Sequence, residues 1–149
     1  MSAFESVNRC DLCGGTAIDD LHPVVCTVRC RGCAHVFHSP RPTLSAIREF
    51  YSRSGAYEGW LQSLAERRGP WRWRAAMVRR FRSHGRLLDI GAGIGEFLAE
   101  VRAEFDITGT ELSAEAVRIA RERFGIALLE GDLATLDLSG RRFDVITLF

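Results

Sequence analysis

The sequence lacks the features that mark membrane-spanning and secreted proteins. No apolar run approaches the roughly 18 residues that a membrane span needs. The first ten residues, MSAFESVNRC, do not follow the charged-then-apolar order of a signal peptide. We therefore expect a cytoplasmic protein with no membrane partner.

The chain also lacks an excess of charge of either sign. Its 20 basic and 19 acidic residues give a formal net charge of +1, which offers no electrostatic case for a nucleic-acid partner. Arginines do cluster over residues 67–86, where the pattern fits either a solvated helix face or a phosphate-binding patch. The hydrophobic content of 46% predicts a packed core, and 149 residues suit one domain or a small module with part of a larger one.

Five cysteines are present, an odd number that suits a disulfide framework poorly. Four of them form the pairs CDLC and CRGC, which is the spacing of a zinc ribbon. Two thiolates on each tight turn reach one ion, and two such turns complete a tetrahedron that holds shape without catalysing a reaction. The sequence therefore predicts a structural Zn²⁺ site made of Cys10, Cys13, Cys30 and Cys33.

Three further residues near this site leave alternatives open. Cys26 is interpreted as a small buried hydrophobe within the strand VVCTV, with no other role assigned. His35 and His38 are substitute ligands, although four cysteines already close a structural site.

The N-terminal half divides into two predicted segments, a zinc-ribbon-like module over residues 1–42 and a helical linker over residues 43–85. The prolines of SPRPT end the module, and the linker holds a helix capped by Thr43, the glycine-bearing connection SRSGAYEGW and a helix over 71–82. The first helix carries Leu44, Ile47, Phe50 and Tyr51 on one face, and the second carries Trp71, Ala75, Val78 and Phe81 toward a core.

From residue 86 to residue 149, apolar strand patterns alternate with helix patterns. Strands are expected at RLLDI, ITGTEL, IALLE and FDVITLF, with helices at EFLAEVRAEF and after Ser113, as far as Gly125. This alternation predicts an α/β fold, with a Rossmann-like parallel sheet of about four strands and helices on both faces. The sheet would follow the small zinc ribbon and two helices.

A glycine-rich turn follows the first of these strands. Gly91, Gly93 and Gly95 let the backbone approach a ligand at a helix N-terminus. A dinucleotide fingerprint needs a small residue where this chain has Glu96. Asp89, just before the turn, suits a ligand with a positive group, and S-adenosylmethionine carries both an ammonium and a sulfonium.

Acidic residues also end the next two strands. Glu111 can accept both hydroxyls of a ribose, and Asp132 can accept the exocyclic amine of adenine while Leu133 lies against the ring. Each acid has an alternative reading: Asp89 as a surface turn residue, Glu111 as a helix-capping partner and Asp132 as the residue that forms an Asx turn. Three acids at three successive strand ends, together with the glycine turn, argue against coincidence.

These residues resemble the class I S-adenosylmethionine-dependent methyltransferases. DIGAGIG is similar to the first motif of that family, GTELS to its acidic second motif and GDL to its third. The resemblance implies S-adenosylmethionine as cofactor, with Tyr51 or Tyr57 either contacting it or packing within the helix and linker. It implies a methionine end lined by Asp89, Gly91, Gly93 and Gly95, a ribose site at Glu111 and an adenine site at Asp132 and Leu133, with Leu112 as a further cofactor-binding residue.

The N-terminal part resembles a subgroup in which a cysteine ribbon precedes the methyltransferase domain. CDLCGG and VRCRGCAHVFHSPRPT carry this second resemblance. Members of the subgroup often modify sugars or other small metabolites. The sequence therefore predicts a methyltransferase acting on a small molecule, with a zinc-containing non-catalytic binding module or an RNA methyltransferase with an RNA-docking ribbon as alternatives.

The last expectation concerns the length of the sheet. The family's sheet has seven strands and this sequence stops at the fourth, so we expect an N-terminal fragment that is inactive alone and whose catalytic base lies elsewhere. An open edge of a parallel sheet also predicts self-association.

Overall fold

The computed structural model describes residues 3–53, 55 and 57–149, which form two compact units, Met1–Phe50 and Tyr51–Phe149. The predicted boundaries at residues 42 and 85 stay predictions. Within the described ranges, no helix is both long and apolar enough to cross a membrane.

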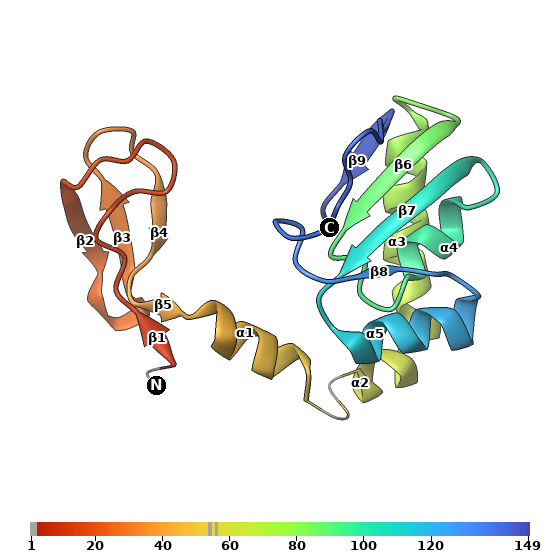
Figure 1. Cartoon of the computed structure of the whole chain (residues 1–149), viewed down its shortest axis with the longest axis horizontal. Helices are drawn as coiled ribbons and strands as arrows, with labels where there is room; N and C mark the ends of the chain where they lie inside the picture. The colour runs from red at the N-terminus through yellow and green to blue at the C-terminus, as the bar shows by residue number, and fades with distance from the viewer. Residues whose placement is uncertain (1–2, 54, 56) are drawn as a thin grey trace. The chain divides into compact units, whose positions relative to one another are not determined.

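The first unit is built from short antiparallel strands (Figure 1). Its larger sheet has the order β2-β3-β4, and a separate pair joins β1 to β5. A helix, α1, follows, and Thr43 Oγ1 accepts the N–H of Ala46 at 3.2 Å, as expected of its predicted N-cap. The bounds are β1 Phe4–Glu5, β2 Ile18–His22, β3 Thr27–Cys30, β4 Val36–His38, β5 Arg41–Pro42 and α1 Leu44–Tyr51.

Cys26 does not lie in a strand, so that part of the sequence prediction is wrong. Pro23 opens a short 3-10 turn, η1 (Pro23–Val25), and Cys26 ends it in the left-handed conformation with φ 51°. The strand β3 begins only at Thr27, and Cys26 is half-buried rather than buried. A proline at the first position of the turn fixes φ and removes an N–H, which interrupts the strand there.

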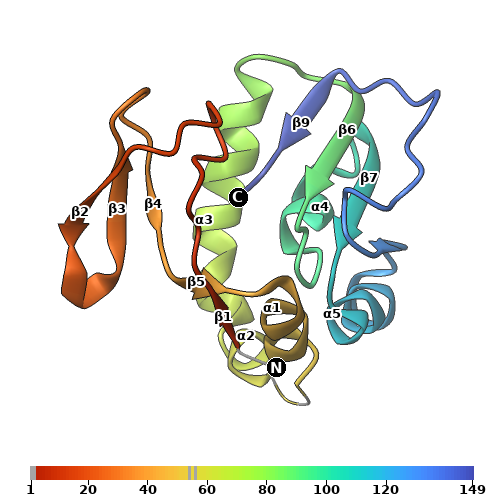
Figure 2. The same cartoon turned by 60° about the vertical axis from the view of Figure 1, so that its left-hand side comes forward.

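The second unit is an α/β domain with a four-stranded parallel sheet of order β8-β7-β6-β9. Figure 2 shows three of these strands, β7, β6 and β9, side by side. The predicted fold class is confirmed, although β8 and β9 are shorter than expected. The helices are α2 Glu58–Gln62, α3 Leu64–Arg79, α4 Glu96–Val101 and α5 Ala114–Ile119. The last of these continues as a short π-helix, η2 Ala120–Phe124. The strands are β6 Gly85–Ile90, β7 Phe105–Glu111, β8 Leu129–Glu130 and β9 Val145–Thr147.

The core of this domain lies where α3, α4 and η2 pack with residues of the sheet. Phe97 of α4 is 1% exposed, and its ring centroid lies 6.4 Å from that of Trp71 on α3. The strands β6 and β7 pair from Gly85 opposite Phe105 to Ile90 opposite Thr110, one residue before the end of β7. Their carboxyl ends therefore meet at one edge. The buried members of the main core are Ala75, Val78, Leu87, Phe97, Leu98, Val101, Phe105, Ala120, Ile126 and Leu128.

Two helical features differ from the sequence prediction. The helix α3 starts seven residues before the predicted start at Trp71 and runs through Pro70. Phe81, predicted to face the core, lies beyond the helix end and is 86% exposed. The segment 52–60, predicted as a connection, contains the first residues of the helix α2. Residues 54 and 56 of this segment lie outside the described residues.

Candidate cofactor site and metal centre

The glycine turn joins β6 to α4 in a conformation that favours glycine. Gly91, Gly93 and Gly95 have φ values of 72°, 55° and 84°, all in the left-handed region. Gly95 is the N-cap of α4, and a methyl group built on it would lie 3.3 Å from Cβ of Ala120. The turn therefore needs glycine for its backbone and, at this end, for its packing.

Glu111 ties the end of β7 to this turn. Its Oε2 accepts the N–H of Gly93 at 2.8 Å, and its Oε1 accepts the N–H of Ser113 at 2.9 Å. The residue is only 8% exposed. Each carboxylate oxygen can accept a second hydrogen bond, so the pair retains capacity for two further donors, such as adjacent hydroxyls.

A cleft of about 210 Å³ opens at the carboxyl ends of β6, β7 and β8. Parallel strands end at the same edge, and this brings together five residues that the sequence predicted, namely Gly91, Glu111, Leu112, Asp132 and Leu133. The sequence reasoning did not single out Ile90, Thr110 and Gly131, which also line the cleft; their signal was only their position at or just after strand ends.

Asp89, Gly93 and Gly95 do not line this cleft. Asp89 is 4% exposed at the seam between β6 and β9, where Thr147 Oγ1 donates to its Oδ1 at 2.7 Å. Burial raises the pKa of Asp89 to about 6; the hydrogen bond from Thr147 opposes this, and the charge of Glu111 adds to it. A nearby cation would favour the ionised carboxylate. Its contact with a ligand stays a prediction.

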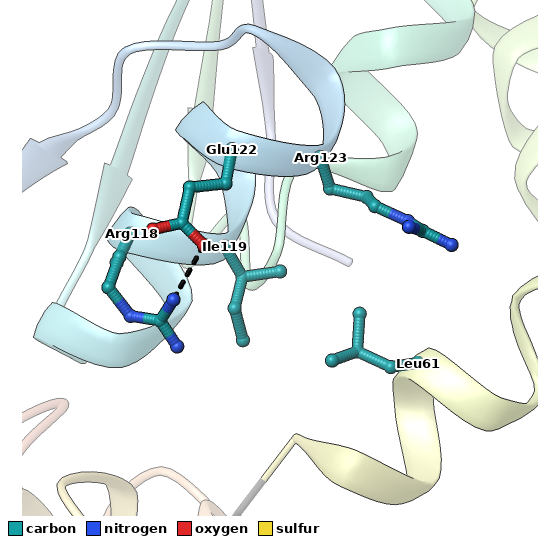
Figure 3. Close-up of a pocket in the computed structure, with 5 residues that line it drawn as sticks. All are labelled: Leu61, Arg118, Ile119, Glu122 and Arg123. Atoms are coloured by element: carbon teal, nitrogen blue, oxygen red, sulfur yellow. Dashed lines mark hydrogen bonds and ion pairs between the residues drawn. The ribbon is translucent and has the colours of Figure 1, made fainter.

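Two larger cavities near the domain surface do not share these features. One, of about 350 Å³, lies between α2 and the helix α5 with its continuation η2 (Figure 3). Its Arg118–Glu122 ion pair is more than half exposed on both sides. The second, of about 400 Å³, lies between α3 and α4 and includes Glu96, whose carboxylate is already paired with Arg67. The strand-end cleft is therefore the better candidate site.

Neither predicted tyrosine lines the cleft. Tyr57 is 4% exposed and packs with Ile94, Ala116 and Ile119, and burial raises the pKa of its hydroxyl. The backbone oxygen of Tyr51 accepts the hydroxyl of Ser113 at 2.8 Å. The structure thus shows packing and backbone roles for these two residues.

Glu96, which departs from the dinucleotide pattern, is buried in an ion pair. Nη2 of Arg67 lies 2.6 Å from its Oε2, and Nε of Arg67 donates to its Oε1 at 3.3 Å. The guanidinium also lies 4.0 Å above the ring centroid of Trp60. No local sequence pattern marks this three-residue contact, because Glu96 lies 29 positions from Arg67 along the chain.

Half of the eight arginines in the segment 67–86 form ion pairs, and three of these four lie on α3. The four bind carboxylates of the same unit, and the ion pairs are Arg67–Glu96, Arg68–Glu100, Arg79–Glu104 and Arg82–Asp144. These arginines are already engaged, which favours the helix-face reading over the phosphate-binding patch.

In the first unit, the four predicted cysteines converge. Their Sγ atoms all lie within 4.8 Å of one another, and the Cys10–Cys33 and Cys13–Cys30 pairs are each 3.6 Å apart. A tetrahedron with Zn–S bonds of about 2.3 Å has an S–S edge of about 3.8 Å. The cluster therefore fits one tetrahedral ion, and these cysteines could hold a metal.

The two cysteine turns have the same backbone hydrogen bonds. The N–H of Cys10 donates to the carbonyl five residues on at 2.8 Å, and that of Cys30 does the same at 2.9 Å. Gly14 and Ala34 then donate back to Cys10 and Cys30 at 2.8 and 2.9 Å. Both residues are left-handed, with φ values of 74° and 62°, although only the first is a glycine.

The substitute ligands lie outside this cluster. Nδ1 of His38 is 3.0 Å from the oxygen of Val25, and the ring of His35 stacks on Phe37. Among the described residues, the candidate metal site consists of the four cysteines alone.

Comparison with known proteins finds a family match within the second unit. Residues 87–149 match the family described as a methyltransferase domain. Among curated proteins, no sequence match was found. The matched segment and the fold together confirm the resemblance to class I S-adenosylmethionine-dependent methyltransferases.

Solved structures add particular relatives. An amino pentose methyltransferase from Micromonospora echinaspora, bound to S-adenosylmethionine, is 35% identical with a TM-score of 0.50, over 60% of this chain and 41% of that one. A sugar N-methyltransferase from Streptoalloteichus sp. is 28% identical with a TM-score of 0.50, over 62% of this chain and 39% of that one. A magnesium protoporphyrin IX methyltransferase from Synechocystis, at 16% identity, shares the fold, with a TM-score of 0.57 over 70% of this chain and 57% of that one. The chain thus spans about two fifths of the length of the sugar-modifying relatives.

Proposed function

We propose that the second unit binds S-adenosylmethionine in the cleft at the ends of β6, β7 and β8. The observation that carries this proposal is the carboxylate of Glu111, which accepts two backbone hydrogen bonds and belongs to a residue that lines the cleft beside the glycine turn. Glu111 would accept the ribose hydroxyls, and Asp132 with Leu133 would take the adenine. Asp89, Gly91, Gly93 and Gly95 would serve the methionine end, and the bound cofactor would supply a methyl group on a sulfonium.

The proposed activity of the whole protein is methyl transfer to a small molecule, with sugars as the first class to test. Support comes from two relatives at 28% identity or more, which are described as methyltransferases of an amino pentose and of a sugar nitrogen. The protein's own share of such a reaction would be mainly the alignment of the attacking atom with the methyl group.

We further propose that the cysteine cluster holds a structural Zn²⁺. Four thiolates leave no open coordination position, so the ion would stabilise the first unit without taking part in chemistry. Metal analysis of protein prepared without added metal tests this. About one zinc per chain is expected, and iron in its place would contradict the assignment.

Calorimetric titration with S-adenosylhomocysteine tests the cofactor proposal, with NAD as the control ligand. Glu111→Gln replaces one acceptor oxygen by a donor that faces a backbone N–H, so affinity should fall about tenfold to a hundredfold. Glu104→Gln, at a carboxylate paired with Arg79 on the surface, is the matched control and should leave affinity unchanged. Equal binding of both ligands, or an unaffected Glu111→Gln variant, would contradict the proposal.

A further inference from the structure

We infer that Trp60 is a positioning residue of the cofactor site, because its ring lies against Gly93, the glycine whose N–H donates to Glu111. This inference rests on the proposed function. It assigns a role in cofactor binding to α2, an element that lies outside the motifs of the methyltransferase resemblance.

The contact with Gly93 is close. A methyl group built on Gly93 would lie 3.0 Å from Cζ3 of Trp60, which is tighter than ordinary van der Waals contact. The N–H of the same glycine donates to Glu111 at 2.8 Å. Gly93, which has a left-handed φ of 55°, therefore contacts both an indole ring and a carboxylate, and each contact restrains its position.

The indole itself is fixed by its neighbours. The Arg67 guanidinium carbon lies 4.0 Å above the Trp60 ring centroid, and Arg67 is in turn paired with the buried Glu96. The ring of Tyr57 meets that of Trp60 edge-on, with centroids 5.2 Å apart and an interplanar angle of 88°. A cation over an indole face and an edge-on aromatic pair are both attractive arrangements.

The anchors of this arrangement flank the turn. Glu96 is the first residue of α4, the helix that follows the glycine turn. Tyr57 packs with Ile94, which is itself a residue of the turn. Trp60 is therefore attached to both the turn and the helix that follows it. Loss of the ring would leave Gly93 free to move away from Glu111, while the adenine end of the cleft, at Asp132 and Leu133, would keep its walls.

Because Trp60 contacts the glycine turn and not the adenine end of the cleft, ligands that reach different ends test its role. Trp60→Ala should weaken S-adenosylhomocysteine binding about tenfold, whereas adenine, which lacks both the ribose and the methionine part, should bind within about twofold of the unchanged protein. Trp60→Phe keeps an aromatic ring against Gly93 and should restore most of the affinity. Trp73→Ala, at a tryptophan that is 66% exposed, is the matched control and should change neither affinity.

A double-mutant cycle tests the contact without any ligand. Gly93→Ala introduces both a left-handed alanine and a clash with Trp60, but in a Trp60→Ala background only the first cost remains. The fall in Tm caused by Gly93→Ala should therefore be smaller in that background, by about 4 °C. Additive shifts would overturn the inferred contact.

The outcomes separate the inference from the proposed function. If the unchanged protein binds no S-adenosylhomocysteine, the cofactor proposal fails and the positioning role fails with it. If the protein binds but Trp60→Ala weakens both ligands equally, the cofactor proposal stands and Trp60 is merely structural. Selective loss together with a non-additive cycle supports the inference.

Discussion

The two units of this chain differ in what fills their interiors. Among the described residues of the first unit, only Cys10, Val28 and Cys30 are buried, and two of these are candidate metal ligands. The second unit instead buries a continuous apolar cluster between its helices and its sheet. A unit of about fifty residues with so small a core needs a metal or another cross-link to stay folded. With the proposed metal bound, the first unit would draw its stability from ligand bonds, whereas the second unit draws its stability from apolar burial.

Removing the metal should have the largest effect and should separate the two units. A structural zinc contributes on the order of 10 kcal/mol to the folding of a small ribbon. A strong chelator should therefore abolish the dispersed amide signals of residues 3–50 in a heteronuclear NMR spectrum and leave those of the second unit in place. Cys30→Ser should behave alike, with Cys26→Ser as control. A metal-free protein with an intact ribbon spectrum would show that the first unit does not need a metal to stay folded.

The converse change is Phe97→Ala. Phe97 packs with Trp71 and with Phe149, whose ring centroid lies 5.0 Å away, so its truncation leaves a cavity in the core. The free energy of unfolding of the second unit should fall by about 4 kcal/mol in urea titrations, with unchanged metal content. The exposed control Phe81→Ala should stay within about 0.5 kcal/mol.

Asp89 tests how the second unit balances stability against binding. Its pKa of about 6 in the folded protein exceeds the usual value of about 3.9, so the folded state binds the proton more tightly and stability falls as pH rises through this window. Asp89→Asn should raise the free energy of unfolding by about 2 kcal/mol at pH 7.5, with no gain at pH 4. It should also weaken S-adenosylhomocysteine binding.

Denaturation of this variant at the two pH values provides the measurement. Asp106→Asn, an exposed position on β7, is the matched control. A gain of the same size at pH 4 would show that ionisation of Asp89 is not its source.

The smallest expected effect compares the two cysteine turns with each other. Ala34 holds a left-handed φ of 62° where the equivalent position of the other turn has Gly14. A left-handed alanine costs roughly 1 kcal/mol relative to glycine. Ala34→Gly should therefore stabilise the metal-bound ribbon by about that amount in chelator competition, and Gly14→Ala should destabilise it similarly. If Ala34→Gly instead destabilised the metal-bound ribbon, side-chain contacts at Ala34 would outweigh its backbone strain.

The features that the sequence predicted well depend on short-range geometry. The spacing of Cys10 and Cys13 encodes a turn, and Gly91 with its neighbours encodes another. Glu111 and Asp132 could be placed together because strands that alternate with helices run parallel and end at one edge. These inferences needed no knowledge of how distant side chains pack.

The features that it missed depend on long-range contacts. The helix predicted over 71–82 begins instead at Leu64, where Arg67 pairs with Glu96 and the later turns of α3 pack on the core. The contact of Trp60 with Gly93 joins residues from separate elements, and no local pattern marks it. Tertiary packing of this kind overrides local propensity.

The carboxylate of Glu111 has a consequence for the energetics of binding. Two backbone N–H groups hold its orientation before any ligand arrives, so its side-chain torsions lose their freedom when the domain folds. A ligand that meets this preorganised acceptor does not have to order it, and association is spared that entropy. Part of the affinity is therefore stored in the fold, and a substitution that loosens the end of β7 would weaken binding without contacting the ligand.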